Sequence, residues 1–500
     1  MFSCLRRGNP SEASRLKKCV VVALIRDTNM PITVSPYDHQ QKSYEFTLGL
    51  YGVLPSHLHS NGAALLMEMG TGKSLTSIGV AGTLYQCGYI NRLLIVAPLS
   101  ITTVWLEEFE KFAAFPYTLT ILEGSSDKKR KAIEEFSGAG LEVLVINYES
   151  AWRLEKELAA WKPDMIICDE GHKIKTHNTS ASKAMHRLGA AAKYRMLLTG
   201  TPVTNKALDI FSQYKFLNPA IFGRSFYTFR SRYFYMTGYG QHTPVMKDSM
   251  EKEFTKRLHS IAFRATKAEC LDLPETTDIV RKVVLEPKAM KIYQRLVDES
   301  YAELASGEVT VPNVLTRLLR LSQLTGGFLG NDDNSRVEQV SNAKLAVLED
   351  IIDTSVQESQ KLVIIARFVP EIHAIEKMME KKGLRYSLIM GEVKDRGEQV
   401  RQFQTDSNVP VFIGQIATAG MGLTLTAAST MVFYSLDYSM SNYEQCRARI
   451  HRAGQKFPCT YIHIIAKGTV DGKVMQALKN KANLAKSLID DWRKGNNPFA

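Results

Sequence analysis

The fold is decided by the stretch Ala63-Ala-Leu-Leu-Met-Glu-Met-Gly-Thr-Gly-Lys-Ser74. Its first residues form an apolar run typical of a buried strand, and a helical pattern follows from about Leu75 to Cys87 and stops at Gly88. A glycine turn between a strand and a helix directs backbone N–H groups and the positive end of the helix dipole at a phosphate. We therefore expect a phosphate-binding loop in this stretch.

Within that loop, Lys73 is expected to reach the outer phosphates of a nucleotide, and the hydroxyl of Ser74 is expected to ligate Mg²⁺. Only the closing Gly-x-Gly-Lys-Ser of the usual G-x4-G-K-[ST] pattern is present, because Met67 stands where the first glycine would be. Taken alone, the stretch is also compatible with a glycine-rich turn that binds nothing. The residues downstream decide between the two interpretations.

Composition limits the class of protein. A chain of 500 residues is too long for one hydrophobic core and suggests two or three domains. The seven cysteines are odd in number and form no C-x-x-C pair, which favours a reducing compartment over a disulfide framework or a structural zinc site.

The charge of +12 suggests a polyanionic partner, although a basic surface that serves only solubility is the plain alternative. No apolar run approaches the length of a membrane span, so we expect no membrane partner. Residues 1–34 are expected to form an N-terminal extension that either adds an edge strand at Cys19–Ile25 or lies outside the fold, with Met30 as an alternative start.

Several further apolar runs follow the loop and alternate with helical patterns, which predicts a parallel sheet covered by helices on both faces. Each run ends in polar or small residues, and in open α/β sheets ligands bind at the carboxyl ends of the strands. We expect these ends to line one site. The expected strands are Leu93–Ala97, Val143–Ile146, Met165–Cys168 and Met196–Leu198.

Asp169-Glu170 is the pair that favours the phosphate-loop interpretation. A carboxylate after an apolar strand can hold Mg²⁺ opposite Ser74, and a second carboxylate can orient and deprotonate the attacking water. The alternative is two solvated loop acids. Upstream, Gln40 is a candidate for reading an adenine edge, because its amide both donates and accepts, although a surface helix position is the plain alternative.

These motifs together resemble superfamily-two helicases. Gly70-Thr-Gly-Lys-Ser74, Asp169-Glu-Gly-His172 and Leu198-Thr-Gly-Thr-Pro202 look like motifs I, II and III. The flanking residues resemble the Swi/Snf branch: Ala97-Pro-Leu-Ser100 with Trp105 and Glu107-Glu-Phe109, Lys173-Ile-Lys175, Asn205, and Phe263-Arg-Ala-Thr-Lys267 with Leu273-Pro274. Met67 departs from that branch, which usually has an acidic residue there.

The resemblance implies two RecA-like α/β lobes with parallel sheets and an inserted helical segment between them. We expect lobe 1 at residues 35–275 with a helical insertion from about 203, a helical connector at 276–342, and lobe 2 at 343–500. Aromatics and arginines interleave between Phe211 and Tyr239, as in Phe226-Tyr-Thr-Phe-Arg-Ser-Arg-Tyr233. They suit the core of that insertion, and base stacking is the alternative.

The second half repeats the strand–helix alternation from Lys361 but lacks a phosphate loop. Its Gln445-Cys-Arg-Ala-Arg449-Ile-His451-Arg452-Ala-Gly-Gln455 resembles motif VI. By position in that motif, Arg449 and Arg452 are candidate arginine fingers that offset charge on the transferring phosphoryl group, and Arg447 is a solvated or structural residue.

Thr418-Ala-Gly-Met-Gly-Leu-Thr424 resembles motif V, and with Ala466-Lys-Gly-Thr-Val-Asp471 it is closer to the annealing-helicase, fork-remodelling sub-branch. The resemblance implies the cofactors ATP and Mg²⁺. The implied nucleotide-binding residues are Gln40, Met69, Gly70, Thr71, Gly72, Lys73, Ser74, Gly422 and Gln445, with Ser74 and Asp169 on the metal and Lys73, Asp169, Glu170, Arg449 and Arg452 in catalysis.

The sequence thus predicts an ATP-dependent translocase that hydrolyses ATP between two lobes and moves along double-stranded or forked DNA without sequence preference. A strand-separating DNA or RNA helicase is one alternative, and a non-catalytic DNA-binding protein with a degenerate ATPase fold is another. We expect a bacterial or phage-infected cytoplasm, or the nucleus if the source is a eukaryote.

Overall fold

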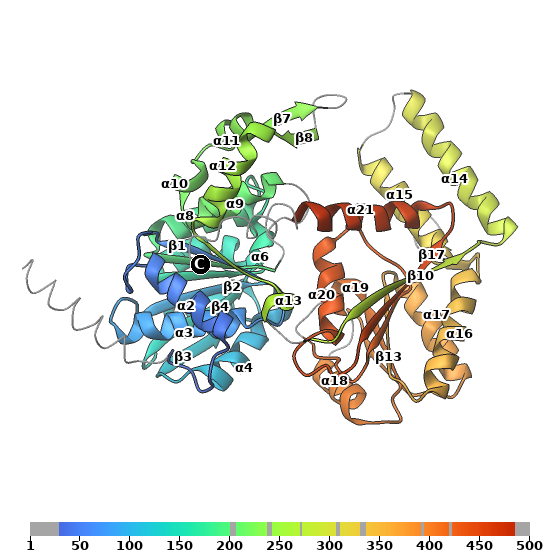
Figure 1. Ribbon diagram of the computed structural model, residues 1–500, viewed down its shortest axis with the longest axis horizontal. Coiled ribbons are helices and arrows are strands. Elements are labelled where there is room, and N and C mark those ends of the chain that lie inside the picture. The colour runs from blue at the N-terminus through green and yellow to red at the C-terminus, as the bar shows by residue number, and fades with distance from the viewer. Residues whose placement is uncertain are drawn as a thin grey trace, which may run out of the picture. The chain divides into compact units, whose positions relative to one another are not determined.

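The computed structural model of the protein describes residues 30–200, 207–237, 243–270, 273–306, 311–330, 337–391, 395–419 and 423–485. The chain forms two compact units, of which unit 1 runs to Cys270 and unit 2 runs from Leu271 to Leu484. Figure 1 shows a twisted sheet with flanking helices in each unit, coloured blue to green in unit 1 and yellow-green to red in unit 2. Within the described ranges, no helix combines the length and apolar character needed to cross a membrane.

Unit 1 is built on a seven-stranded sheet in the order β3-β4-β2-β5-β6-β1-β9, with every described pairing parallel. The central strands are fully buried, because continuous apolar runs let helices cover both faces. The strands are β1 (Gly62–Met67), β2 (Arg92–Ala97), β3 (Tyr117–Ile121), β4 (Leu141–Asn147), β5 (Met165–Asp169), β6 (Tyr194–Leu198) and β9 (Ala262–Ala265).

The helices of unit 1 alternate with these strands as the sequence predicts. Before the insertion they are α2 (Asp38–Leu50), α3 (Lys73–Gln86), α4 (Thr102–Phe112), α5 (Ser126–Glu134), α6 (Tyr148–Arg153), α7 (Glu155–Trp161) and α8 (Ser180–Ala191). The 3-10 turns η1 (Leu99–Ile101), η2 (Gly171–Ile174) and η3 (Ala207–Asp209) and the short helix α13 (Lys267–Cys270) complete the described part of the unit.

Residues 30–33 belong to unit 1 rather than to a loose extension. Met30 is buried beside Gly79 of α3, and Ile32 forms a β-bridge with Ala113. The expected extension at 1–34 is therefore too long at its C-terminal end, because an apolar Met-Pro-Ile segment fills the groove that two helix glycines leave. Residues 1–29, including the possible strand at Cys19–Ile25, lie outside the described residues.

Between β6 and β9 the chain forms a helical insertion. It contains α9 (Ile210–Leu217), α10 (Pro219–Phe222), α11 (Phe226–Tyr233), the hairpin of β7 (Phe234–Thr237) with β8 (Thr243–Met246), and α12 (Asp248–His259). Most of its rings pack on one another, which confirms them as core residues: Phe211, Tyr214, Phe222, Phe229, Tyr233 and Phe254 are buried. Tyr227 and Tyr235 are exposed, and Arg230 and Lys247 lie over their rings.

Unit 2 contains a six-stranded sheet in the order β10-β17-β16-β13-β15-β14, again with parallel pairings. Its strands are β10 (Thr276–Val283), β13 (Leu362–Ala366), β14 (Tyr386–Ile389), β15 (Val411–Gln415), β16 (Thr430–Phe433) and β17 (Cys459–Ala466). Its other elements are α14 (Pro287–Ser306), α15 (Val311–Thr325), β11 (Phe328–Gly330), β12 (Val337–Gln339), α16 (Ala343–Gln357), α17 (Val369–Lys381), α18 (Arg396–Thr405), α19 (Ile416–Ala419), α20 (Met440–Ile450) and α21 (Val470–Ala485). The two parallel α/β sheets confirm the expected fold class.

The expectation of a helical connector at 276–342 is wrong for its first residues. Strand β10 pairs with β17 along its whole length, from Thr276 opposite Cys459 to Val283 opposite Ala466. Seven of its eight residues are exposed, so the strand carries little of the apolar signal by which buried strands are recognised. The chain therefore enters the second sheet directly, and the helices α14 and α15 come after it.

A buried ion pair ties the start of α16 to the start of α21. The Lys344 ammonium lies 2.6 Å from an Asp471 carboxylate oxygen and donates to the Tyr434 carbonyl. Asp471 also accepts from the Thr325 hydroxyl and the Ala466 amide. The Lys344 side chain is 1% exposed and that of Asp471 is 12% exposed, so each charge depends on its protein partners rather than on water.

We predict that Asp471→Ala lowers the free energy of unfolding by about 3–5 kcal/mol, because Lys344 stays buried without its counter-charge. Urea unfolding followed by circular dichroism measures this change. The matched control is Asp350→Ala on α16, whose exposed side chain makes no ion pair among those described. Equal stability of the two variants would contradict the importance of the pair.

Candidate functional site

The loop between β1 and α3 has the conformation that phosphate binding needs. Gly70 and Gly72 have φ of 83° and 90°, in the left-handed region that suits glycine and strains other residues. Gly72 is the N-cap of α3, so the free N–H groups of the first turn of that helix face the loop. The predicted strand–loop–helix unit is present, and Met69, Thr71 and Ser74 are all part of it.

Lys73 is held at the end of β1. Its ammonium donates to the carbonyls of Met67, at 2.9 Å, and Glu68, at 3.2 Å. Burial lowers the pKa of Lys73, and the negative charges of Glu170, Asp169 and Glu68 oppose that shift. The carbonyl contacts also explain why Met67 is tolerated in this position: its side chain is buried in the core, and only its backbone oxygen contacts the lysine.

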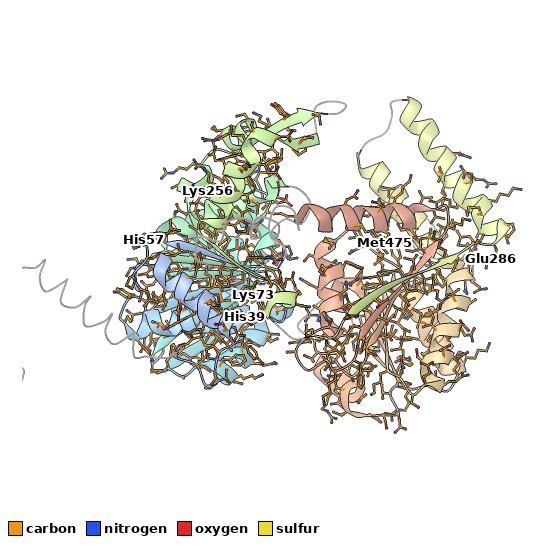
Figure 2. The ribbon with its side chains drawn as sticks, in the orientation of Figure 1. His39, His57, Lys73, Lys256, Glu286 and Met475 are labelled. Carbon is orange, nitrogen blue, oxygen red and sulfur yellow. The ribbon has the colours of Figure 1, made fainter. Side chains whose placement is uncertain are left out.

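Gln40 is buried and contacts the loop, so its alternative placement on a helix surface is wrong. Its amide nitrogen donates to the Thr71 carbonyl at 3.2 Å, and its amide oxygen accepts from the Tyr37 amide at 2.9 Å. His39, which the sequence analysis missed, contacts the same Thr71 carbonyl at 2.8 Å. Figure 2 labels His39 and Lys73, and both lie on unit 1.

Asp169 is the last residue of β5 and Glu170 follows it. Both are buried, so the alternative of two solvated acids is wrong. The Trp105 indole donates to Asp169 at 3.0 Å, and the Tyr148 hydroxyl donates to the Asp169 carbonyl at 2.7 Å. Burial, followed by the charge of Glu170, raises the pKa of Asp169. The residues after β2 and β4 thus meet those after β5 at one edge of the sheet, as expected.

Glu170 adopts a left-handed backbone with φ of 48°, which is uncommon for a residue other than glycine. One of its carboxylate oxygens lies 3.3 Å from the His172 Nδ1 atom. A strained backbone that points a buried carboxylate in a fixed direction is a feature of functional sites.

The residues of this edge fit a bound Mg²⁺. Ser74 supplies a hydroxyl from the first turn of α3 and Asp169 supplies a carboxylate at the end of β5, which are the hard oxygen donors that Mg²⁺ prefers. Both Asp169 oxygens accept one hydrogen bond, from Trp105 and from the Glu170 amide, so the carboxylate is oriented before any ligand arrives.

Two hydrogen bonds hold the side chain of Glu68, which lies just before the loop. Arg264 of β9 donates to the Glu68 carboxylate at 3.1 Å, and the Lys267 amide donates to its other oxygen at 3.0 Å. The segment Phe263-Arg-Ala-Thr-Lys267 is part of the resemblance to the Swi/Snf branch, and these contacts attach it to the residue before the loop. The acidic residue and its partners lie almost two hundred positions apart in the sequence, so spacing alone could not have paired them.

In unit 2, the candidate arginines lie on α20 and just after it. Arg449 and Arg452 both donate to the Leu423 carbonyl, at 3.3 and 3.1 Å. The Gln445 amide contacts the Ser441 hydroxyl at 3.3 Å. Arg447 is paired with Asp278, which agrees with a structural role. Gly422, Thr201, Pro202 and Asn205 lie outside the described residues.

Unit 2 also contains a cavity of about 870 Å³ near the carboxyl ends of β13 and β15, lined in part by Arg367, Phe368, Glu371 and Gln415. None of the candidate site residues lines it. Cavity size therefore does not identify the candidate site, which is recognised by its loop, its half-buried lysine and its paired acids.

Two family matches cover most of the chain. Residues 39–325 match the SNF2-related domain, which is more than half of the chain. The chain belongs to the SNF2-related family. Residues 343–454 match the helicase conserved C-terminal domain. The expected family is thereby confirmed, whereas the annealing-helicase sub-branch stays a prediction.

Relatives of this SNF2-related chain include the DNA repair and recombination protein RDH54 of Saccharomyces cerevisiae, 26% identical over 490 residues, which covers 88% of this chain and 52% of the relative. The RAD54-like DNA repair and recombination protein of Gallus gallus is 27% identical over 484 residues, covering 86% and 64%. The chain thus spans about half to two thirds of the length of these relatives. The Sulfolobus solfataricus SWI2/SNF2 ATPase core in complex with dsDNA is 24% identical, with 92% and 94% coverage and a TM-score of 0.45.

We predict that Gly72→Ala distorts the loop. A Cβ there would lie 2.1 Å from the Gln40 amide nitrogen and would also strain a backbone with φ of 90°. Gly88→Ala is the matched control, because its φ is 69° and no atom lies within 4 Å of its added Cβ. Thermal unfolding should show a loss of about 1 kcal/mol for the control and a larger loss for Gly72→Ala. If the two losses are equal, the contact with Gln40 does not constrain the loop.

Proposed function

We propose that this protein is a DNA-dependent ATPase that binds ATP on unit 1 and uses its hydrolysis to move along double-stranded or forked DNA. The observation that carries the proposal is the half-buried Lys73, held by two carbonyls beside the negative charges of Asp169 and Glu170. A half-buried cation next to paired acids at the mouth of a phosphate loop suits a triphosphate and its metal.

In this proposal the nucleotide lies against the loop residues. The amides of Gly70 to Ser74 and the dipole of α3 stabilise the phosphates, and the Lys73 ammonium turns from the Met67 carbonyl to the outer phosphates. Gln40 reads the adenine edge, which requires its amide to exchange its contact with the Thr71 carbonyl for one with the base.

Ser74 and Asp169 hold Mg²⁺, which when bound neutralises charge on the phosphate oxygens. Glu170 accepts the proton of the attacking water, and the His172 imidazole lies beside its carboxylate.

Arg449 and Arg452 act as arginine fingers that stabilise charge on the transferring phosphoryl group, with Gln445 and Gly422 near the nucleotide. Both guanidinium groups contact the Leu423 carbonyl in the described structure, so the role requires them to exchange this acceptor for phosphate oxygens.

DNA as the partner is supported by the relatives, whose names describe DNA repair and recombination proteins, and by the net charge of +12. Contacts to the phosphate backbone carry little sequence information, so binding should be insensitive to sequence and should weaken steeply with salt. The location in the cell stays a prediction.

We predict that Glu170→Gln lowers the rate of ATP hydrolysis by about 100-fold or more, because the amide cannot accept a proton. The affinity for the nucleotide should be retained. Lys73→Ala should instead lose affinity for ATP itself. Binding of a fluorescent ATP analogue and release of phosphate, measured on the same preparations, separate the two effects. Full hydrolysis by Glu170→Gln would remove Glu170 from the proposed mechanism.

Movement along DNA is tested by displacement of a third strand from a DNA triplex, which requires tracking but no separation of the duplex. We predict ATP-dependent displacement by the wild type and none by Glu170→Gln. Unwinding of a tailed duplex without triplex displacement would favour the helicase alternative. Full biological activity of Lys73→Ala would favour the non-catalytic alternative.

A further inference from the structure

Helix α20 carries the candidate arginine finger Arg449, and arginine side chains on two opposite faces of the helix make contacts with the rest of unit 2. Arg447 and Arg449 are two positions apart, which places them about 200° apart around a helix of 3.6 residues per turn. Arg449 faces the Leu423 carbonyl, whereas Arg447 faces Asp278 of β10. Any rotation of the helix would therefore move both contacts at once.

The contact between Arg447 and Asp278 is bidentate. The two guanidinium nitrogens lie 2.5 and 3.0 Å from the two carboxylate oxygens, a geometry that fixes direction as well as distance. The Arg447 side chain is 16% exposed and that of Asp278 is 47% exposed. Arg447 therefore depends on this carboxylate for much of its charge compensation.

Aromatic side chains hold the guanidinium in place. Its central carbon lies 3.8 Å from the ring centroid of Tyr461, and one nitrogen donates to the Tyr443 hydroxyl at 2.8 Å. Tyr461 stands opposite Asp278 in the β10–β17 pairing, and its hydroxyl donates to the Arg447 carbonyl. The side chain of Arg447 is thus attached to the edge strand β10, and its backbone is attached to the neighbouring strand β17.

A second contact ties the same stretch of chain to the end of the helix. The His451 imidazole lies 2.9 Å from the Pro274 carbonyl, just before β10 begins. Pro274 and Asp278 lie in the first part of unit 2, directly after the segment that leaves unit 1 at Cys270. The chain is therefore fastened to α20 where it enters the second unit.

We infer that the Asp278–Arg447 pair positions α20, and with it Arg449 and Arg452, for ATP hydrolysis. Asp278 and Arg447 are positioning residues that touch no nucleotide, and their role rests on the proposed function. Because β10 is the strand by which the chain enters unit 2, the pair also makes the orientation of the arginines depend on that strand. Displacement of β10 would then change turnover without any change in the phosphate loop.

The test compares Asp278→Asn and Arg447→Met with Glu275→Gln, which removes a carboxylate from an exposed position just before β10. We expect both variants of the pair to lower kcat for DNA-stimulated hydrolysis by about tenfold, because a displaced group loses much of its effect on the transition state. The KM for ATP should change less than twofold, because the loop on unit 1 is intact. Asp278→Asn combined with Arg447→Met should be no slower than Arg447→Met alone, and Asp278→Glu should recover part of the rate.

Amide hydrogen exchange gives a readout that does not depend on activity. Residues 440–450 should exchange faster in Asp278→Asn than in the wild type or Glu275→Gln, with melting temperatures within a few degrees of one another. If Asp278→Asn matches Glu275→Gln in both kcat and exchange, the inference is overturned while the proposed function stands. If the wild type hydrolyses no ATP under any condition, the proposed function fails and the exchange rates alone decide whether the pair holds the helix.

Discussion

The rest of the site on unit 1 depends on one contact, in which the Lys73 ammonium donates to the carbonyls of Met67 and Glu68 at the end of β1. Those carbonyls are available only because β1 ends at Met67 and the chain turns sharply through two glycines with positive φ. Strands β6 and β9 flank β1, and Arg264 of β9 fixes Glu68 beside the loop. The paired acids at the end of β5 then face a cation whose position is already set.

Two buried acids beside a half-buried cation lower the stability of the folded chain unless a ligand compensates their charges. Burial raises the pKa of Asp169 and lowers that of Lys73, so it disfavours the charged form of both groups. In the proposed function, a bound triphosphate and its metal would supply compensating charges on both sides. These groups therefore lower the stability of the protein without ligand, as is common at functional sites.

The sequence was most informative where strands are buried. The apolar runs of β1, β2, β4, β5 and β6 predicted their strands, because burial on both faces requires continuous apolar residues. The sequence did not predict the strands β3 and β10 at the edges of the two sheets. Strand β3 is only half-buried and β10 is largely exposed, so neither carries that signal.

The same division applies to the site. Lys73, Asp169, Glu170 and Gln40 were predicted because each lies in a short motif with a chemical reason for its spacing. His39 and Arg264 were missed as site neighbours, because their roles come from contacts between distant parts of the chain. For His39, the adjacency to Gln40 in the first turn of α2 was the available signal. Trp105 was found only through the resemblance.

The most direct measurement is the rate of ATP hydrolysis by the wild type without nucleic acid and with single-stranded DNA, duplex DNA, forked DNA or RNA at one salt concentration. The account predicts slow hydrolysis alone and strong stimulation by duplex or forked DNA that falls steeply as salt rises. Stimulation only by single strands or RNA would contradict movement along a duplex. No hydrolysis with any of them would contradict the account as a whole.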